Sequence, residues 1–165
     1  PPLYNDETDL EARRDYFGGV KAQQAIVCAL MQGPDSDYDR GEAIAKLIYA
    51  PVLRTHRITV EQMAILEPTM AETCAIPLIS ALRECLDEAI ARGVPKEAAW
   101  DFMIGHLNIE LAICFDQVGS PFSDGAMLIR DYGRPKILRD GWKKLFEPES
   151  VKEQVKTIVA GKLPE

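Results

Sequence analysis

The order of apolar and polar positions before residue 59 is typical of two short strands joined by a helix. An apolar run at 24–32 and the alternating segment Val-Leu-Arg-Thr-His-Arg-Ile at 52–58 both have strand character. Between them, residues 36–50 follow a helical period, which Ser36 or Asp35 can cap and Pro51 ends. This arrangement predicts a βαβ unit. Two strands cannot bury both of their faces, so we expect the unit to close a larger α/β sheet that precedes this chain.

The first residues of the chain lead to the same expectation. The sequence begins with Pro1-Pro2 and has no initiator methionine. We therefore expect this chain to be one part of a longer protein, with the rest of the α/β sheet upstream of Pro1.

Helical periodicity dominates after residue 59. Thr59 and Gln62 match a capping box, in which each side chain bonds the backbone N–H of the other residue. A long helical pattern then continues to Arg92, and Pro68 and Pro77 predict a break or kink because each lacks a backbone N–H.

Three further helices are expected beyond this point. Residues 95–117 form a helix that is apolar almost all round, and such a helix is usually buried. A short helix is predicted over 125–132, ended by Gly-Arg-Pro at 133–135, and an amphipathic helix over 148–160. The predicted class is therefore mainly α, with the end of an α/β portion at 1–58 and a helical domain at 59–165.

Composition excludes several classes of protein. A net charge of -7 argues against a general nucleic-acid or anionic-membrane binder, and we expect neither partner. No continuous apolar run reaches 18 residues, and the N-terminus has no signal-peptide character. The 4 cysteines are scattered and form no Cys-x-x-Cys pair, which fits a reducing cytoplasm and predicts neither disulfides nor a metal site.

Three polar residues interrupt the apolar helix at 95–117. His106 and Glu110 are four positions apart and share a face, so the carboxylate could orient the imidazole as a general base. The same pair could bind a divalent metal or form a structural hydrogen bond in the core. Asn108 lies on the opposite face and is a candidate for substrate binding or for contact with a dimer partner.

A second carboxylate is also a candidate acid/base. Glu67 lies in an apolar stretch beside Pro68, and desolvation there would favour its protonated form. The structural alternative is a glutamate that stabilises the N-terminus of a helix restarting at Pro68.

The segment after the apolar helix is a candidate pocket. An irregular turn at 119–125 carries Ser123 and Asp124, either of which could cap the next helix or line a pocket mouth. Residues 130–144 then hold six basic and two acidic side chains, Lys143 and Lys144 among them. This stretch is either a solvated basic turn or the wall of a site for a small anion.

The segments GHLNIELAICFDQVGSPFSD at 105–124, THRITVEQMAILEPTMAET at 55–73 and WKKLFEP at 142–148 resemble a known bacterial family. It is the phosphogluconate-dehydrogenase-like or semialdehyde-dehydrogenase-like family that includes the D-apionate oxidoisomerases. The resemblance implies a helical C-terminal domain that binds the substrate and forms a homodimer, joined to an N-terminal Rossmann domain that holds NAD or NADP. The residues that bind the cofactor would then lie upstream of Pro1.

In an enzyme of this kind, the expected roles fall on the candidate residues named above. His106, oriented by Glu110, would be the general base and Glu67 a second acid/base. Lys143 or Lys144 would hold the carboxylate of a small polyhydroxylated or branched acid, with Ser123, Asp124 and Asn108 lining the site. Dehydrogenases of the wider superfamily place a lysine on the helix that enters this domain, whereas this chain has Glu61, Glu67 and Glu72 there.

A non-catalytic helical interaction or dimerisation module is the alternative function. The βαβ unit favours the enzyme, because a self-contained helical module does not need it. Within the enzyme class, the sequence leaves open NAD or NADP, the acid itself, the use of a divalent metal and the oligomeric state.

Overall fold

The computed structural model describes residues 24–164, which form a mainly helical chain with one two-stranded sheet. The chain divides into two compact units, residues 1–67 and 68–165, and each is described by itself. The mainly helical class with a short βαβ segment at its start, predicted from sequence, is confirmed. The first part of the predicted α/β portion, from Pro1 to residue 23, lies outside the described residues.

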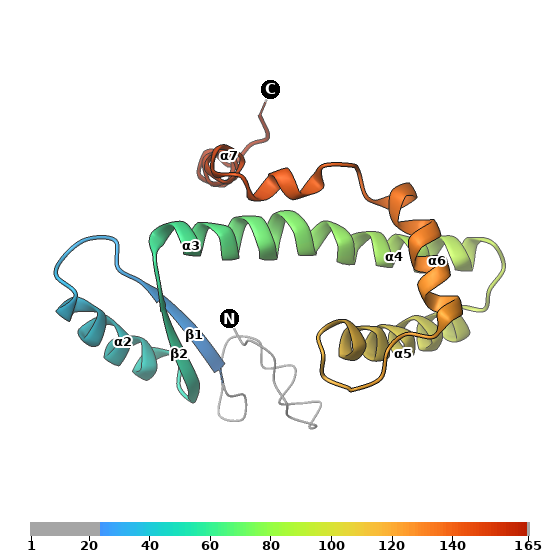
Figure 1. The fold of residues 1–165 in the computed structure, drawn as a ribbon, viewed down its shortest axis with the longest axis horizontal. Helices are drawn as coiled ribbons and strands as arrows, with labels where there is room; N and C mark the ends of the chain where they lie inside the picture. Colours follow the sequence, from blue (N-terminus) through green and yellow to red (C-terminus); the bar gives the residue numbers. More distant parts are fainter. Residues whose placement is uncertain (1–23, 165) are drawn as a thin grey trace. The chain divides into compact units, whose positions relative to one another are not determined.

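The first unit contains the predicted βαβ segment. Strands β1 (Gln24–Ala29) and β2 (Val52–Ile58) pair in parallel, with Ile26 opposite Thr55, and α2 (Ser36–Ile48) connects them. The helix is fixed to the sheet by polar contacts, since the Tyr38 hydroxyl donates to the Ile58 carbonyl at 2.8 Å. Figure 1 shows α2 beside the two strands.

An ion-pair cluster strengthens the same connection. The Arg57 guanidinium on β2 donates to Asp39 at 2.6 Å and to Glu42 at 2.9 Å, both on α2. Hydrogen bonds from Lys46 and from Arg57 hold the pKa of the Glu42 carboxyl below its usual range. The crossover helix is therefore held to β2 by charge as well as by packing.

A continuous helical run of 32 residues, Val60–Ala91, follows β2. The predicted capping box begins it: Gln62 N–H donates to Thr59 Oγ1 at 3.2 Å, and Thr59 N–H donates to Gln62 Oε1 at 2.9 Å. Helix α3 (Val60–Ala64) passes into a π-helix (Ile65–Ala75) and then into α4 (Ile76–Ala91). Where a break or kink was predicted, the α-helical pattern changes: Pro68 lies in the π-helix and Pro77 in the first turn of α4. The helical run itself stays continuous, because the wider π turn accommodates a residue without an N–H.

The same run has the length of a membrane span. By length and composition alone, Val60–Ala91 could cross a membrane, with a mean hydropathy of 1.2 and 11% of its most apolar window buried. The core helix of a soluble protein passes the same test, so the expectation of no membrane partner stays a prediction.

The second unit continues with four helical elements after α4. Helix α5 (Lys96–Cys114) packs on α4, with Ala99 and Leu86 buried. Helix α6 (Asp124–Ile137), a 3-10 helix (Trp142–Phe146) and α7 (Pro148–Ala160) follow. The side-chain amide of Gln154 on α7 donates to the Leu145 carbonyl at 2.8 Å and so fixes α7 to the 3-10 helix.

Two predictions about these helices were wrong. Helix α6 does not end at Gly133-Arg134-Pro135 but continues to Ile137, because a proline in the last turn removes only one hydrogen bond. Helix α5 is not buried all round within this chain: its described neighbours cover one face, and Phe102 is 68% exposed.

Candidate functional site

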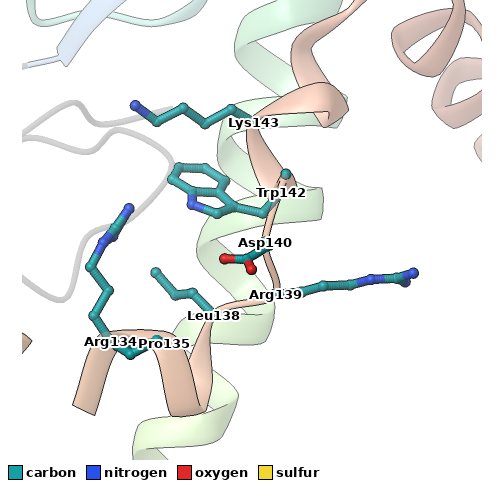
Figure 2. Close-up of a pocket in the computed structure, with 8 residues that line it drawn as sticks. Arg134, Pro135, Leu138, Arg139, Asp140, Trp142 and Lys143 are labelled. Carbon is teal, nitrogen blue, oxygen red and sulfur yellow. The ribbon is translucent and has the colours of Figure 1, made fainter. Parts of the chain in front are cut away.

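The end of α6 and the 3-10 helix enclose a cavity of about 320 Å³ within the second unit (Figure 2). This volume is at the lower end of the range for small-molecule sites. Its walls are a short, continuous piece of chain, consisting of Arg134, Pro135, Leu138, Arg139, Asp140, Gly141, Trp142 and Lys143.

Local backbone geometry creates this cavity. Arg134 lies in the last turn of α6, and Gly141 adopts a left-handed conformation with φ 76°. A residue with a side chain adopts that conformation only at a cost, so glycine suits this turn. The turn starts the 3-10 helix at Trp142, and the half-buried Leu138 and Trp142 side chains supply the apolar part of the wall.

Positive charge dominates the polar part of the wall, with three cations against the single carboxylate of Asp140. Figure 2 shows the Arg134 and Lys143 side chains on the same side as the Trp142 ring, with Arg139 directed away. Within residues 24–164, Arg134 and Lys143 form no ion pair. Two unneutralised cations beside an indole wall suit a small anion that also has apolar surface.

The structure separates the two lysines that the sequence put forward together. Lys143 lines the cavity and Lys144 does not. Ser123 is the N-cap of α6, where its hydroxyl accepts from the Ala126 N–H at 3.3 Å, and Asp124 is the first residue of that helix. Neither Ser123 nor Asp124 lines this cavity, so their expected place at its mouth is not found.

His106 on α5 is exposed, and its ring stacks on Phe102 with centroids 4.0 Å apart. Its Nδ1 lies 2.9 Å from the Phe102 carbonyl oxygen. A carbonyl only accepts, so Nδ1 carries the proton and Nε2 keeps a free lone pair, which is the tautomer a general base needs. In the described part of the chain Glu110 makes no hydrogen bond to His106, so the Phe102 carbonyl provides the orientation expected of Glu110.

The remaining predicted residues lie elsewhere. Glu67 is exposed within the π-helix, so the desolvation expected for it is absent in this chain. Asn108 is exposed on α5.

Glu72, from the same π-helix, borders a second cavity of about 430 Å³. That cavity is lined by residues of the π-helix, the 3-10 helix, α7 and the C-terminal segment: Glu72, Thr73, Leu145, Ser150, Glu153, Gln154, Thr157, Ile158 and Pro164.

Of the residues that line this cation-lined cavity, sequence reasoning named only Lys143 as a site residue. Arg134 was counted in the basic stretch but was expected to break a helix, whereas Leu138 and Trp142 carried no functional signal. The density of cations between 130 and 144 was the available signal. It did not reveal which cations share a cavity, because that depends on the turn at Gly141.

The loop after β1 does not form a phosphate loop, and the described residues contain no metal-binding group. The loop after β1 contains one glycine, Gly33, and a Cβ placed there would lie 2.4 Å from the Asp37 carboxylate. A glycine-rich phosphate loop needs open backbone N–H groups and no nearby carboxylate, so this loop does not fit a pyrophosphate. Residues 24–164 also contain no group of three or more histidine, cysteine or acidic side chains that could hold a metal ion.

The cofactor-binding residues were expected upstream of Pro1. That position lies outside the described residues, which begin at Gln24, so the expectation stays a prediction. Within 24–164, the loop at Gly33 offers no substitute for it.

Comparison with known proteins is consistent with this description. The D-apionate oxidoisomerase of Cupriavidus necator is 51% identical over 158 residues, which cover 96% of this chain and 57% of that protein. The D-apionate oxidoisomerase of Rhizobium rhizogenes is 50% identical, with coverage of 96% and 58%. The chain thus spans less than two thirds of the length of these curated relatives.

A solved structure is equally similar. The semialdehyde dehydrogenase NAD-binding protein of Cupriavidus necator, in complex with calcium and NAD, superposes with a TM-score of 0.90 at 52% identity. The match covers 95% of this chain and 57% of that chain. Residues 5–159 match the phosphogluconate dehydrogenase (decarboxylating) C-terminal domain. The chain therefore belongs to the family of phosphogluconate dehydrogenase (decarboxylating) C-terminal domains.

Proposed function

We propose that this chain is the substrate-binding and dimerisation part of an NAD-dependent oxidoisomerase. Its substrate would be D-apionate or a closely related small polyhydroxylated, branched carboxylic acid. The observation that carries the proposal is the cavity of Arg134, Trp142 and Lys143, whose charge and size suit such an acid. The names and the 50–51% identity of the relatives support the reaction class.

The cavity residues would hold the acid rather than react with it. Lys143 Nζ and the Arg134 guanidinium are charged donors, and a carboxylate accepts from such donors through charge-assisted hydrogen bonds. The Leu138 and Trp142 side chains would contact the carbon skeleton and exclude water on one side. Fixing the acid end orients the rest of the molecule, which is the main contribution of a substrate domain in a cofactor-dependent enzyme.

His106 is the proposed general base. Its Nε2 is free to accept a proton from a substrate hydroxyl, while Nδ1–H donates to the Phe102 carbonyl. Glu67 is kept as a second candidate acid/base with a weaker basis, because its carboxylate is exposed.

The cofactor would be bound mainly by a Rossmann half upstream of Pro1. NAD is favoured over NADP because a relative with a TM-score of 0.90 was solved in complex with NAD. When bound, the nicotinamide supplies the hydride acceptor. The proposal also includes a homodimer formed by the helical domain and a cytoplasmic location.

Turnover by the full-length protein tests the proposal. We expect D-apionate with NAD to yield NADH. D-apiose lacks the carboxylate and should react at least about tenfold less efficiently, since each lost hydrogen bond to a charged group costs about 1.5–3 kcal/mol. Equal turnover of the acid and the sugar would remove the role of the cavity. Absence of NADH formation with any small hydroxy acid would favour the non-catalytic interaction module.

A further inference from the structure

One carboxylate, that of Asp140, lies in the wall of a cavity that otherwise suits an anion. Within residues 24–164 it forms no ion pair with Arg134, Arg139 or Lys143, so no cation of the wall neutralises it. An unneutralised carboxylate repels a bound anion and weakens its binding. A wall that only held an anion would therefore bind it better without Asp140.

The Asp140 side chain is directed into the cavity. Figure 2 shows its carboxylate on the same side of the wall as the Arg134 and Lys143 side chains. In this view the carboxylate lies between the Trp142 ring and Leu138, the apolar part of the wall. Two cations and one carboxylate leave this side with a net charge of +1, which matches a ligand with one negative charge.

A carboxylate in this position can bind hydroxyl groups. An ionised carboxylate only accepts hydrogen bonds, and its two oxygens accept several of them. A hydroxyl donates to such a charged acceptor more strongly than to a neutral one. A polyhydroxylated acid therefore offers a partner to each part of the wall: its carboxylate to Arg134 and Lys143, and its hydroxyls to Asp140.

The same side chain acts against other acids. A ligand with a second anionic group places that group in the field of the Asp140 carboxylate, and the like charges repel each other. Specificity of this kind combines an attraction for the right ligand with a repulsion of the wrong one. A cavity of about 320 Å³ has room for a small dicarboxylic or phosphorylated acid, so charge rather than volume makes the distinction.

We propose that Asp140 determines the substrate class of the cation-lined cavity. It accepts hydrogen bonds from the hydroxyls of a singly charged acid and excludes acids that carry a second anionic group, whether carboxylate or phosphate. The inference rests on the proposed function and narrows its substrate to small polyhydroxylated monocarboxylic acids.

Two matched acids test this selectivity in the full-length protein. L-Threonate and L-tartrate share a carbon chain and both central hydroxyls, and differ only where the terminal CH₂OH of L-threonate is a second carboxylate in L-tartrate. Isothermal titration calorimetry gives the Kd of each acid. Measuring in the presence of NADH prevents oxidation of either acid, so the result does not depend on turnover.

Neutral variants of Asp140 should lose the selectivity. Wild type should bind L-threonate more tightly than L-tartrate. Asp140→Asn keeps the size of the side chain and removes its charge, so the ratio of Kd for L-tartrate to Kd for L-threonate should fall at least about tenfold. Asp140→Ser, a second neutral residue that suits a turn, should show the same fall. Asp140→Glu keeps the charge and should keep the ratio within about threefold of wild type.

Asp131→Asn is the matched control. It removes the same charge from α6 outside the cavity wall, where the Asp131 carboxylate accepts from Arg130 at 2.8 Å. An exposed pair of this kind contributes little, so the Kd ratio should change less than about twofold. Thermal melts show whether each variant is folded.

Several results would overturn the proposal. They are an unchanged Kd ratio in folded Asp140→Asn or Asp140→Ser, an equal fall in Asp131→Asn, and equal binding of the two acids by wild type. Absence of binding of either acid to wild type would overturn it too, because the cavity would then not accept such acids.

Turnover separates this inference from the proposed function. If wild type turns over D-apionate with NAD and Asp140→Asn leaves the Kd ratio unchanged, the role of Asp140 is refuted and the proposed activity stands. If the ratio falls as expected but D-apionate is not turned over, the role of Asp140 is supported and the proposed activity is not.

Discussion

Removing the Lys143 charge should weaken substrate binding without weakening the fold. Lys143 lines the cation-lined cavity and has no ion pair within residues 24–164, so Lys143→Met deletes a charged donor and keeps most of the stem. A hydrogen bond to a charged group contributes about 1.5–3 kcal/mol. That free energy corresponds to a roughly 10- to 150-fold loss in kcat/KM for D-apionate, expressed mainly as a higher KM.

The neighbouring lysine provides the control. Lys144→Met removes the same charge one position away, outside the cavity wall, so long-range electrostatic effects are matched. Steady-state kinetics of both full-length variants, at fixed NAD and varied D-apionate, should show a loss for Lys143→Met and less than about a twofold change for Lys144→Met. Equal losses in the two variants would refute a local role for the cavity and leave only a general effect of net charge.

Three further predictions concern single residues. His106→Ala should lower kcat by about 10²-fold or more. Glu110→Gln should leave kcat nearly unchanged, because the Phe102 carbonyl orients the imidazole ring. A larger loss of kcat for Glu110→Gln than for His106→Ala would contradict the role of His106 as general base. Thr59→Ala should cost about 1 kcal/mol, seen as a fall of roughly 2–4 °C in Tm, since the hydroxyl that accepts from the Gln62 N–H is lost. An unchanged melting curve would mean that this bond contributes nothing. Hydrogen bonds lower the pKa of Glu42 in the folded state, so its stabilising effect is complete above the usual glutamate pKa and is lost as pH falls through the lowered value. Between about pH 5 and pH 3, the Tm of Glu42→Gln should therefore fall less steeply with pH than the Tm of wild type.

Local patterns were sufficient to predict the elements that depend on local interactions. The alternation at 52–58 gave β2 with its observed bounds, and the capping box at Thr59 forms as the spacing of Thr59 and Gln62 predicts. Helix α7 begins and ends where its amphipathic pattern does, at 148 and 160. In each case the signal and its structural cause lie within a few residues of one another.

Proline positions alone did not predict how the helix backbone accommodates these residues. A break or kink was predicted near Pro68, and there the α-helix changes to a π-helix at 65–75 that keeps the run continuous. Pro135 was expected to end α6, yet it lies close enough to the C-terminus that the remaining hydrogen bonds suffice, with Leu138 N–H donating to the Arg134 carbonyl at 2.8 Å. Helix propensity gives the local free-energy cost of a proline, whereas the interactions of the surrounding helix determine whether the helix forms despite that cost.

Burial and the pairing of side chains could not be predicted from sequence. The apolar character of 95–117 correctly predicted a helix, but this chain itself leaves most of that helix exposed. The spacing of His106 and Glu110 allowed a pair, but rotamer choice directs the imidazole to the Phe102 carbonyl. The cation-lined cavity depends on the turn at Gly141, which brings Trp142 and Lys143 to the end of α6.

A crystal structure of the full-length protein with NAD and D-apionate is the most direct test of the central claim. We predict that the carboxylate of D-apionate lies within hydrogen-bond distance of Lys143 Nζ or the Arg134 guanidinium, with its carbon skeleton against Trp142. Finding the acid bound elsewhere, with the cavity between α6 and the 3-10 helix filled only by water, would contradict the proposed substrate site.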